Sequence, residues 1–152
     1  MILYRLTRCV YADDLSGTGG RLFGGRWHSV GKPGIYLASS AALALLEVLV
    51  HLQPLMIPDD YCLVEIEVPD DSISQVTIDH LPSNWKDVSP PVELKAFGDA
   101  FLKRQAHLMM KVPSSIIPTE HNYLVNPLHP SMKKVKIVKY EPFDFDSRLR
   151  PT

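Results

Sequence analysis

A stretch rich in glycine and arginine, "GGRLFGGRWH" at residues 19–28, is the first feature of this sequence that could do chemistry. Its two glycine pairs are each followed at once by an arginine, Arg21 or Arg26. Glycine lets a backbone approach a ligand closely, and the planar guanidinium group matches phosphate oxygens. The stretch therefore predicts a site for a phosphorylated ligand. A surface turn with solvated arginines is the alternative, because glycine clusters often mark turns.

A carboxylate inside an apolar segment is the second such feature. Glu47 interrupts "AALALLEVLVHL" at residues 41–52, which is apolar nearly all round and is therefore expected to be a mostly buried helix. A buried carboxylate is costly unless it is paired, hydrogen-bonded or protonated. Glu47 is thus either held by an arginine or the backbone, or it meets a substrate in a cleft. His51, one turn further on, could partner Glu47 or contact the helix C-terminus.

Two more candidates lie in segments that are expected to be strands. Tyr36 belongs to "GIYLA" at residues 34–38, and a strand followed by a helix could bring it together with Arg26 and Glu47 at one cleft. A core or half-buried position is the alternative for Tyr36, since strands favour aromatic residues. Arg5 interrupts an otherwise apolar segment, where a buried ion pair is the alternative to a ligand contact.

A proline-rich segment at residues 111–130, "KVPSSIIPTEHNYLVNPLHP", collects further polar side chains. We expect a well-fixed irregular loop here, and such loops often present ligand-binding groups. The candidates within it are Ser114, Asn122, Asn126 and His129. The spacing of His121 and His129 does not match that of metal ligands on a helix, and no H-E-x-x-H occurs, so no metal site is expected.

Other familiar signatures are absent from the sequence. It contains no G-x-x-x-x-G-K-[ST], no G-x-G-x-x-G and no G-x-S-x-G, so the common nucleotide and serine-hydrolase motifs are excluded. Cys9 and Cys62 form no C-x-x-C motif. We therefore expect neither a zinc site nor a disulfide, and a reducing compartment fits.

Composition and charge describe one globular domain. The 152 residues suffice for a single domain with a sizeable core, and 45% hydrophobic with 22% charged residues is ordinary for a globular protein. The formal net charge of −1 gives no overall field toward nucleic acid or an anionic membrane. The N-terminus lacks the apolar run of a signal peptide, and the longest apolar stretch, residues 41–50, is too short for a bilayer. We expect a cytoplasmic protein.

The scaffold that must position these residues is predicted to be α+β, a single compact domain of strands with two main helices. Strands are expected at residues 2–6, 34–38, 61–69, 107–114 and 133–143, the last as a lysine-rich sheet edge. One helix is expected to begin after Ser39 or Ser40, as its cap, and to run to about His51. The other is expected from about Val92 to His107, with Gly98 weakening it.

Several motifs in order resemble the RES domain family, named for an arginine, a glutamate and a serine. They are the opening "YRL", "GGRW" at residues 24–27, "GIYLASSAALALLEVLVH" at 34–51 and "VPSSIIPTEHNYLVNPLHP" at 112–130, so the resemblance covers almost the whole chain. It implies a fold like that of the ADP-ribosyltransferases. It also implies the toxin half of a bacterial toxin–antitoxin pair with a separate Xre-like antitoxin, and cleavage of NAD+ between nicotinamide and ribose.

The resemblance also assigns residues. The family's arginine, glutamate and serine correspond to Arg26, Glu47 and Ser114, and Arg5 and Tyr36 match further pocket positions. Asn126, from the proline-rich segment, is a further substrate-binding candidate. The family often has asparagine where this chain has His28, to which no role is assigned.

These residues suggest a mechanism. Arg26 and Arg5 would hold the NAD+ diphosphate, and Glu47 would stabilise positive charge on the ribose in an oxocarbenium-like transition state. Tyr36 would stack on nicotinamide, and Ser114 would hydrogen-bond the ribose or carboxamide. NAD+ is then a substrate rather than a cofactor, with water or phosphate as the acceptor.

Two other functions stay open at this point: an ADP-ribosyltransferase that modifies a protein, and a nucleotide-binding module without activity. The expected partners are the antitoxin and a second copy of the chain within the toxin–antitoxin complex. The lysine-rich edge strand and the C-terminal "DFDSRLRPT" at residues 144–152 are candidate contact surfaces.

Overall fold

A bent sheet forms the centre of the protein in the computed structural model, which describes residues 1–53 and 58–149. Within these residues the sheet has seven strands in the order β4-β5-β6-β2-β1-β3-β7. The strands are β1 (Ile2–Arg8), β2 (Ile35–Ala38), β3 (Tyr61–Glu67), β4 (Ile73–Gln75), β5 (Met109–Pro113), β6 (His121–Val125) and β7 (Lys136–Pro142). Neighbouring strands pair antiparallel except β4 and β5, which are parallel.

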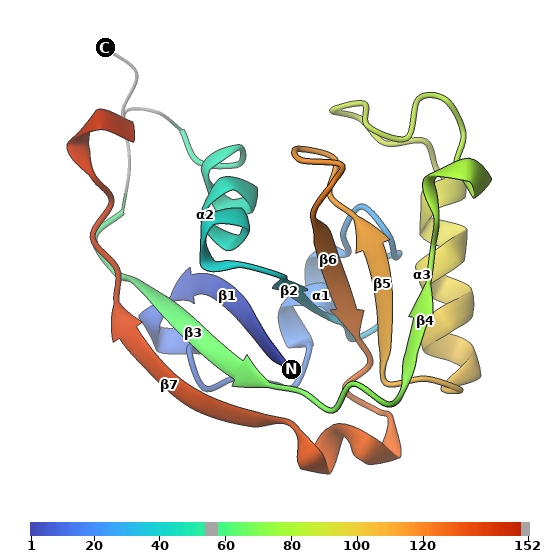
Figure 1. Cartoon of the computed structure of the whole chain (residues 1–152), viewed down its shortest axis with the longest axis horizontal. Coiled ribbons are helices and arrows are strands. Elements are labelled where there is room, and N and C mark those ends of the chain that lie inside the picture. Colours follow the sequence, from blue (N-terminus) through green and yellow to red (C-terminus); the bar gives the residue numbers. More distant parts are fainter. Residues whose placement is uncertain (54–57, 150–152) are drawn as a thin grey trace.

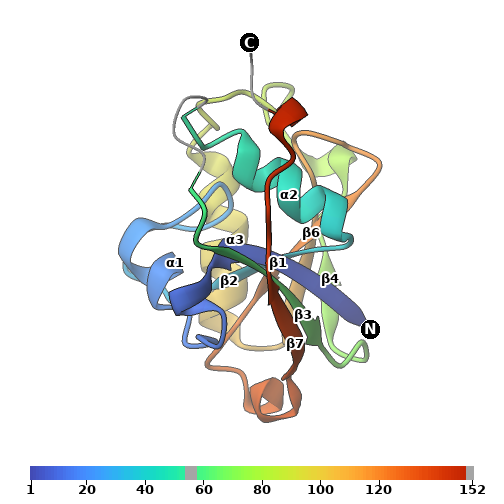
Figure 2. The ribbon, with the colours of Figure 1, turned by 90° about the vertical axis from the view of Figure 1, so that its left-hand side faces the viewer.

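In the described part of the chain, three α-helices accompany the sheet: α1 (Thr18–Phe23), α2 (Ala41–Leu49) and α3 (Glu93–Arg104). In Figure 1, β1, β3 and β7 form one side of the bent sheet and β6, β5 and β4 the other. Figure 2 shows the same sheet with α2 crossing in front of it. The helix α2 packs on β1 and β2, whereas α3 packs against β5 and β6 through Leu94, Phe101 and Leu102. The α+β class and the single compact domain are thus confirmed.

Alternation along the strands separates two faces of the sheet. Ile35 and Leu37 of β2 belong to the core with Val64 and Ile66, whereas Ala38 packs beneath α2 and Tyr36 packs near α3. Successive strand residues point to opposite faces, so Tyr36 and Ala38 share one face. The side chains of β2 that could reach a ligand therefore lie on the helix-covered face.

Most of the predicted elements are confirmed. The strands expected at residues 2–6, 34–38, 61–69, 107–114 and 133–143 match β1, β2, β3, β5 and β7, and β7 is a sheet edge. Ser40 caps α2, because its Oγ accepts the Leu43 N–H at 3.1 Å. In α3, a Cβ at Gly98 would collide with the Trp27 carbonyl oxygen, so glycine is needed for the close approach of helix and loop.

Three expectations about local structure are wrong. The glycine-rich stretch is not all loop, because residues 18–23 form α1. The segment 111–130 is not irregular throughout, since β6 lies within it as a central strand between β5 and β2, and its prolines flank that strand instead of interrupting it. The helix α2 is not buried all round. It covers one face of the sheet, so only Leu43 and Ala44 are fully buried.

A disulfide joins Cys9 and Cys62, contrary to the expectation from their spacing. The two residues are 53 positions apart in the sequence, but antiparallel pairing of β1 with β3 sets Thr7 opposite Cys62. Cys9 follows directly after β1, and the two Cα atoms are 4.9 Å apart. Only the register of the sheet makes this proximity evident, because the motif rule considers cysteines that are close in sequence.

Candidate functional site

A cleft of about 730 Å³ lies between α2, the strands β1 and β2, and the glycine-rich loop. Four of the predicted site residues line it: Arg5, Arg26, Tyr36 and Glu47. His51, Lys95 and Asn122 also line it, and so do the exposed apolar side chains of Phe23, Val50 and Val88. Its volume falls within the range of pockets that hold small molecules and cofactors.

Glu47 projects from α2 and is held by one of its two carboxylate oxygens. Oε1 accepts a hydrogen bond from Ser114 Oγ at 2.8 Å and another from Asn122 Nδ2 at 2.5 Å. Within the described residues, Oε2 accepts none. The expected partners of a structural carboxylate, an arginine or the backbone, are therefore replaced by two neutral side chains. A charged oxygen held by two donors is strongly oriented.

Ser114 follows β5 and is fully buried. Its Oγ accepts hydrogen bonds from the backbone N–H groups of Ile116 and Ile117 at 3.1 and 3.2 Å, while its O–H donates a hydrogen bond to Glu47. One donor and two acceptors complete the capacity of a hydroxyl group. In this structure Ser114 positions Glu47, and no capacity of its hydroxyl is left for the expected hydrogen bond to a ligand.

Asn122 is a candidate of the proline-rich segment whose role the sequence analysis did not assign: its amide contacts Glu47. It lies in β6, opposite Ala38 of β2 and Val112 of β5, and so reaches Glu47 across the sheet. The expectation of an irregular loop at residues 111–130 concealed its place on a central strand. The short run "HNYLV" within the proline-rich segment was the available signal for a strand carrying this side chain.

Arg26 extends from the glycine-rich loop into the cleft. Its Nη1 donates to the carbonyl oxygens of Trp85 at 2.8 Å and Asp87 at 3.0 Å. Burial lowers the pKa of Arg26, and the negative charges of Glu47 and Asp87 oppose that shift. Its Nε and Nη2 make no hydrogen bond with the described residues. Arg26 therefore keeps donors for an anionic ligand while its position is fixed.

Arg5 is held by backbone carbonyls, not by the ion pair that was its alternative. Nη1 donates to Asp14 O at 2.9 Å, and Nη2 donates to Tyr11 O at 2.6 Å and Ala12 O at 3.4 Å. Burial lowers the pKa of Arg5, and Asp14 and Asp13 oppose the shift. Within the described residues, Nε is the one buried side-chain nitrogen or oxygen without a hydrogen-bond partner.

Tyr36 supplies a half-buried aromatic wall, and the glycines explain how closely the loop approaches it. A Cβ at Gly25 would lie 2.6 Å from the Tyr36 hydroxyl and ring. Gly24 has a φ of 65°, a left-handed conformation that favours glycine. The Tyr36 oxygen accepts the Trp27 N–H at 3.2 Å, and burial raises the pKa of the phenol far above its ordinary value. Gly25 thus serves packing against Tyr36, whereas Gly24 ends α1.

The other candidates lie elsewhere. Asn126 is buried, its Nδ2 donates to Leu102 O at 3.1 Å, and its Oδ1 accepts the Leu128 N–H at 3.0 Å. Both ends of its amide are used inside the protein, so the structure does not support the expected substrate-binding role. The ring of His129 caps a short 3₁₀-helix by accepting the Ser131 N–H at 3.1 Å.

The sequence matches a known family over almost all of its length. The RES domain model covers residues 2–146. Toxin Res of Photorhabdus laumondii is 41% identical over 151 residues, 98% of this chain and 97% of that protein. Toxin Res of Pseudomonas putida is 44% identical, with 98% and 99% covered. The chain belongs to the RES domain family, and these relatives are toxins of that family.

Two further comparisons add detail. The Prs ADP-ribosylating toxin of Sphingobium sp. is 41% identical over 146 residues, 93% of this chain and 90% of that protein. The fold is similar to a chain of the crystal structure of the M. tuberculosis MbcT–MbcA toxin–antitoxin complex, with a TM-score of 0.77, 24% identity, and 93% and 83% of the two chains covered. That structural similarity supports the α+β fold of the chain.

The described residues contain neither a membrane-spanning helix nor a metal-binding cluster of side chains. No helix among residues 1–53 and 58–149 is long and apolar enough to cross a bilayer. In the same part of the chain, no group of three or more His, Cys, Asp and Glu side chains is arranged to hold a metal ion.

Proposed function

We propose that this RES-family toxin cleaves NAD+ between nicotinamide and ribose. The observation that carries the proposal is the state of Glu47, a carboxylate in a cleft with one oxygen fixed by Ser114 and Asn122. Departure of nicotinamide leaves positive charge on the ribose, as in glycoside cleavage. A preoriented carboxylate stabilises that charge most strongly in the transition state, where it forms.

The two arginines suit the diphosphate of NAD+. Arg26 retains Nε and Nη2 as donors, so it can approach phosphate oxygens without breaking its hydrogen bonds to backbone carbonyls. Arg5 lines the same cleft, but its Nε is buried and does not face a ligand in this structure. Charge-assisted hydrogen bonds from arginine to phosphate are strong and directional. Arg26 is the principal diphosphate ligand in this proposal, because more of its fork is free.

Tyr36 suits the nicotinamide ring. Its own ring lines the cleft from the same face of the sheet as Ala38, and Glu47 lines the same cleft. Stacking there would set the nicotinamide–ribose bond near the carboxylate. Water or phosphate then takes the ADP-ribosyl group, which makes the enzyme a glycohydrolase or a phosphorylase.

A protein acceptor is the second candidate. One relative is named an ADP-ribosylating toxin, and it covers most of this chain at 41% identity. Transfer to a protein would use the same cleft and the same Glu47, and only the acceptor differs.

We also propose an Xre-like antitoxin as the partner, since an enzyme that consumes NAD+ harms its own cell. The structural relative comes from a toxin–antitoxin complex. The exposed edge strand β7 and residues 144–149 are candidate contact surfaces, whereas residues 150–152 of the expected surface lie outside the described residues.

The test is to incubate the pure protein with NAD+ and measure free nicotinamide by chromatography, with and without phosphate. Release of nicotinamide supports the proposal, and binding without release would leave only a nucleotide-binding module. Labelled ADP-ribose distinguishes the acceptors: label on a protein favours the second candidate, and free ADP-ribose or its phosphate favours the first.

A further inference from the structure

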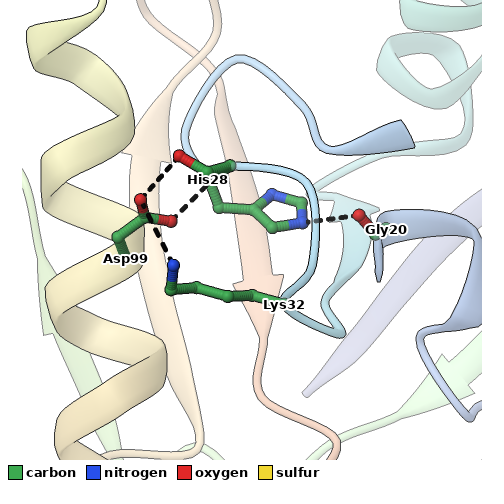
Figure 3. Close-up of polar contacts among 5 residues, drawn as sticks. Gly20, His28, Lys32 and Asp99 are labelled. Atoms are coloured by element: carbon green, nitrogen blue, oxygen red, sulfur yellow. Dashed lines mark hydrogen bonds and ion pairs between the residues drawn. The ribbon is translucent and has the colours of Figure 1, made fainter. Parts of the chain in front are cut away.

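His28 is buried at the centre of a hydrogen-bonded chain that connects α1 with the wall of the cleft. None of its surface is exposed. Its Nε2 lies 3.1 Å from the carbonyl oxygen of Gly20 in α1, and its Nδ1 lies 2.9 Å from the hydroxyl oxygen of Tyr36 in β2. Figure 3 shows the ring edge directed at the Gly20 carbonyl.

The partners of the ring fix its protonation. A carbonyl oxygen only accepts, so Nε2 must carry the proton that goes to Gly20. In a neutral ring Nδ1 is then an acceptor, and the Tyr36 hydroxyl donates to it. The Tyr36 oxygen in turn accepts the Trp27 N–H. The chain is complete with His28 as the neutral Nε2–H tautomer.

The surroundings of His28 leave it little freedom. A Cβ at Gly34 would lie 3.3 Å from Nε2, so the ring rests directly on the backbone. The next residue, Ser29, is held by Asp99 of α3, whose carboxylate accepts its N–H at 2.8 Å and its hydroxyl at 2.6 Å. Lys32 Nζ also lies 3.6 Å from Asp99 (Figure 3). The ring of His28 is therefore fixed to α1 and β2, and the backbone next to it is fixed to α3.

We propose that His28 is a positioning residue for NAD+ cleavage. By accepting a hydrogen bond from the Tyr36 hydroxyl, it locks Tyr36 so that only the aromatic ring of Tyr36 faces the ligand. The inference rests on the proposed function of the cleft. The Tyr36 hydroxyl donates a hydrogen bond to His28 and accepts one from the Trp27 N–H, so it is withheld from the ligand. The same bond ties β2 to the turn that carries Arg26, which directly precedes Trp27 and His28.

The first test uses ¹⁵N NMR of the imidazoles in the wild-type protein, with His28→Gln to assign the His28 signals. We expect the neutral tautomer with the proton on Nε2 at pH 7. In Tyr36→Phe the Nδ1 signal should shift, because its donor is lost. A proton on Nδ1, or no response to Tyr36→Phe, would overturn the proposal. This measurement needs no activity.

The second test is a double-mutant cycle on nicotinamide release. Tyr36→Phe and His28→Leu should each lower kcat by about tenfold with a smaller change in KM, because each leaves a buried partner unpaired. The double variant should be no worse than the poorer single variant, since both remove the same bond. His28→Gln, which can still accept from Tyr36, should recover most of the activity.

The outcomes separate this inference from the proposed function. Multiplicative losses in the double variant, or no recovery in His28→Gln, would overturn the positioning role while NAD+ cleavage stands. A wild-type protein that releases no nicotinamide would overturn the proposed function, and the NMR result would then still decide whether the His28–Tyr36 bond exists. If His28→Leu fails to fold by circular dichroism, Tyr36→Phe and His28→Gln complete the comparison.

Discussion

Asn122 Nδ2 donates to Glu47 Oε1 at 2.5 Å, and this contact joins the central strand β6 to the helix α2. The pair are 75 residues apart in the sequence. The bond sets the direction of the carboxylate, because Ser114 donates to the same oxygen from another side. The Glu47 carboxylate is thus oriented by two side chains of the sheet region, Asn122 in β6 and Ser114 directly after β5.

Asn122→Ala should lower kcat for nicotinamide release by about tenfold to a hundredfold, the range expected when a hydrogen bond to a charged group is removed. The affinity for NAD+ should change much less, since the orientation of Glu47 matters most in the transition state. Steady-state kinetics give both values. Asn84→Ala, at an exposed asparagine, is the matched control. Equal losses in kcat for the two variants would contradict the role of Asn122.

Glu47→Gln keeps the size of the side chain and removes its charge. We expect a folded protein that loses most of its NAD+ cleavage, about a hundredfold or more, because the charge acts on the transition state. Free nicotinamide measures the activity, and thermal unfolding measures the fold. Cleavage at the wild-type rate would show that Glu47 does not act as proposed, and an unfolded variant would favour a structural carboxylate.

Arg26→Lys should weaken binding of a non-cleavable NAD+ analogue by about tenfold, since lysine keeps the charge but loses the planar fork. A lysine that made both bonds to the Trp85 and Asp87 carbonyl oxygens would keep one donor for the ligand, whereas arginine keeps Nε and Nη2. Isothermal titration calorimetry gives the affinity. Arg21→Lys is the control, because Arg21 belongs to α1 and is not among the residues lining the cleft. Equal affinities for wild type and Arg26→Lys would exclude a direct diphosphate contact.

How far the sequence predicts this site depends on whether the partners are local. The pattern of apolar residues is enough to locate β1, β2, β3 and α2, and with them Arg5, Tyr36 and Glu47, because periodicity is a local property. The partners of Glu47 and Arg26 come from β6 and from residues 85–87, and only the tertiary fold brings them close. The Cys9–Cys62 disulfide was missed for the same reason.

His28 illustrates the opposite case, in which the sequence displayed the residue but not its role. A histidine after "GGRW" has no distinctive spacing, and its two partners, Gly20 and Tyr36, lie eight residues away on either side. The glycine pairs before it, at residues 19–25, were interpreted as places of ligand approach. In the structure Gly25 and Gly34 instead allow Tyr36 and His28 to pack against the backbone.

Burial lowers the pKa of His28 in the folded protein below the ordinary value of 6.5. The unfolded chain therefore binds a proton at that residue first as the pH falls, and stability is lost from about pH 6.5 down to the lower folded pKa. His121, whose pKa is also lowered by burial, contributes in the same window. Urea unfolding at pH 7.5 and 5.0 should show a smaller loss of stability in His28→Gln than in wild type. An identical loss in both proteins would contradict a buried neutral His28.

If the antitoxin acts by covering the cleft, it must compete with NAD+ for the same surface. The exposed side chains of Phe23, Val50 and Val88 at the cleft would then be covered when it binds. Coupling between two ligands is reciprocal, so a saturating NAD+ analogue should weaken antitoxin binding by the factor by which the antitoxin weakens analogue binding. The test titrates the protein encoded by the neighbouring gene onto Glu47→Gln, with and without the analogue. Antitoxin affinity that does not change at saturating analogue would exclude occlusion and point to control by another route, such as the abundance of the two proteins.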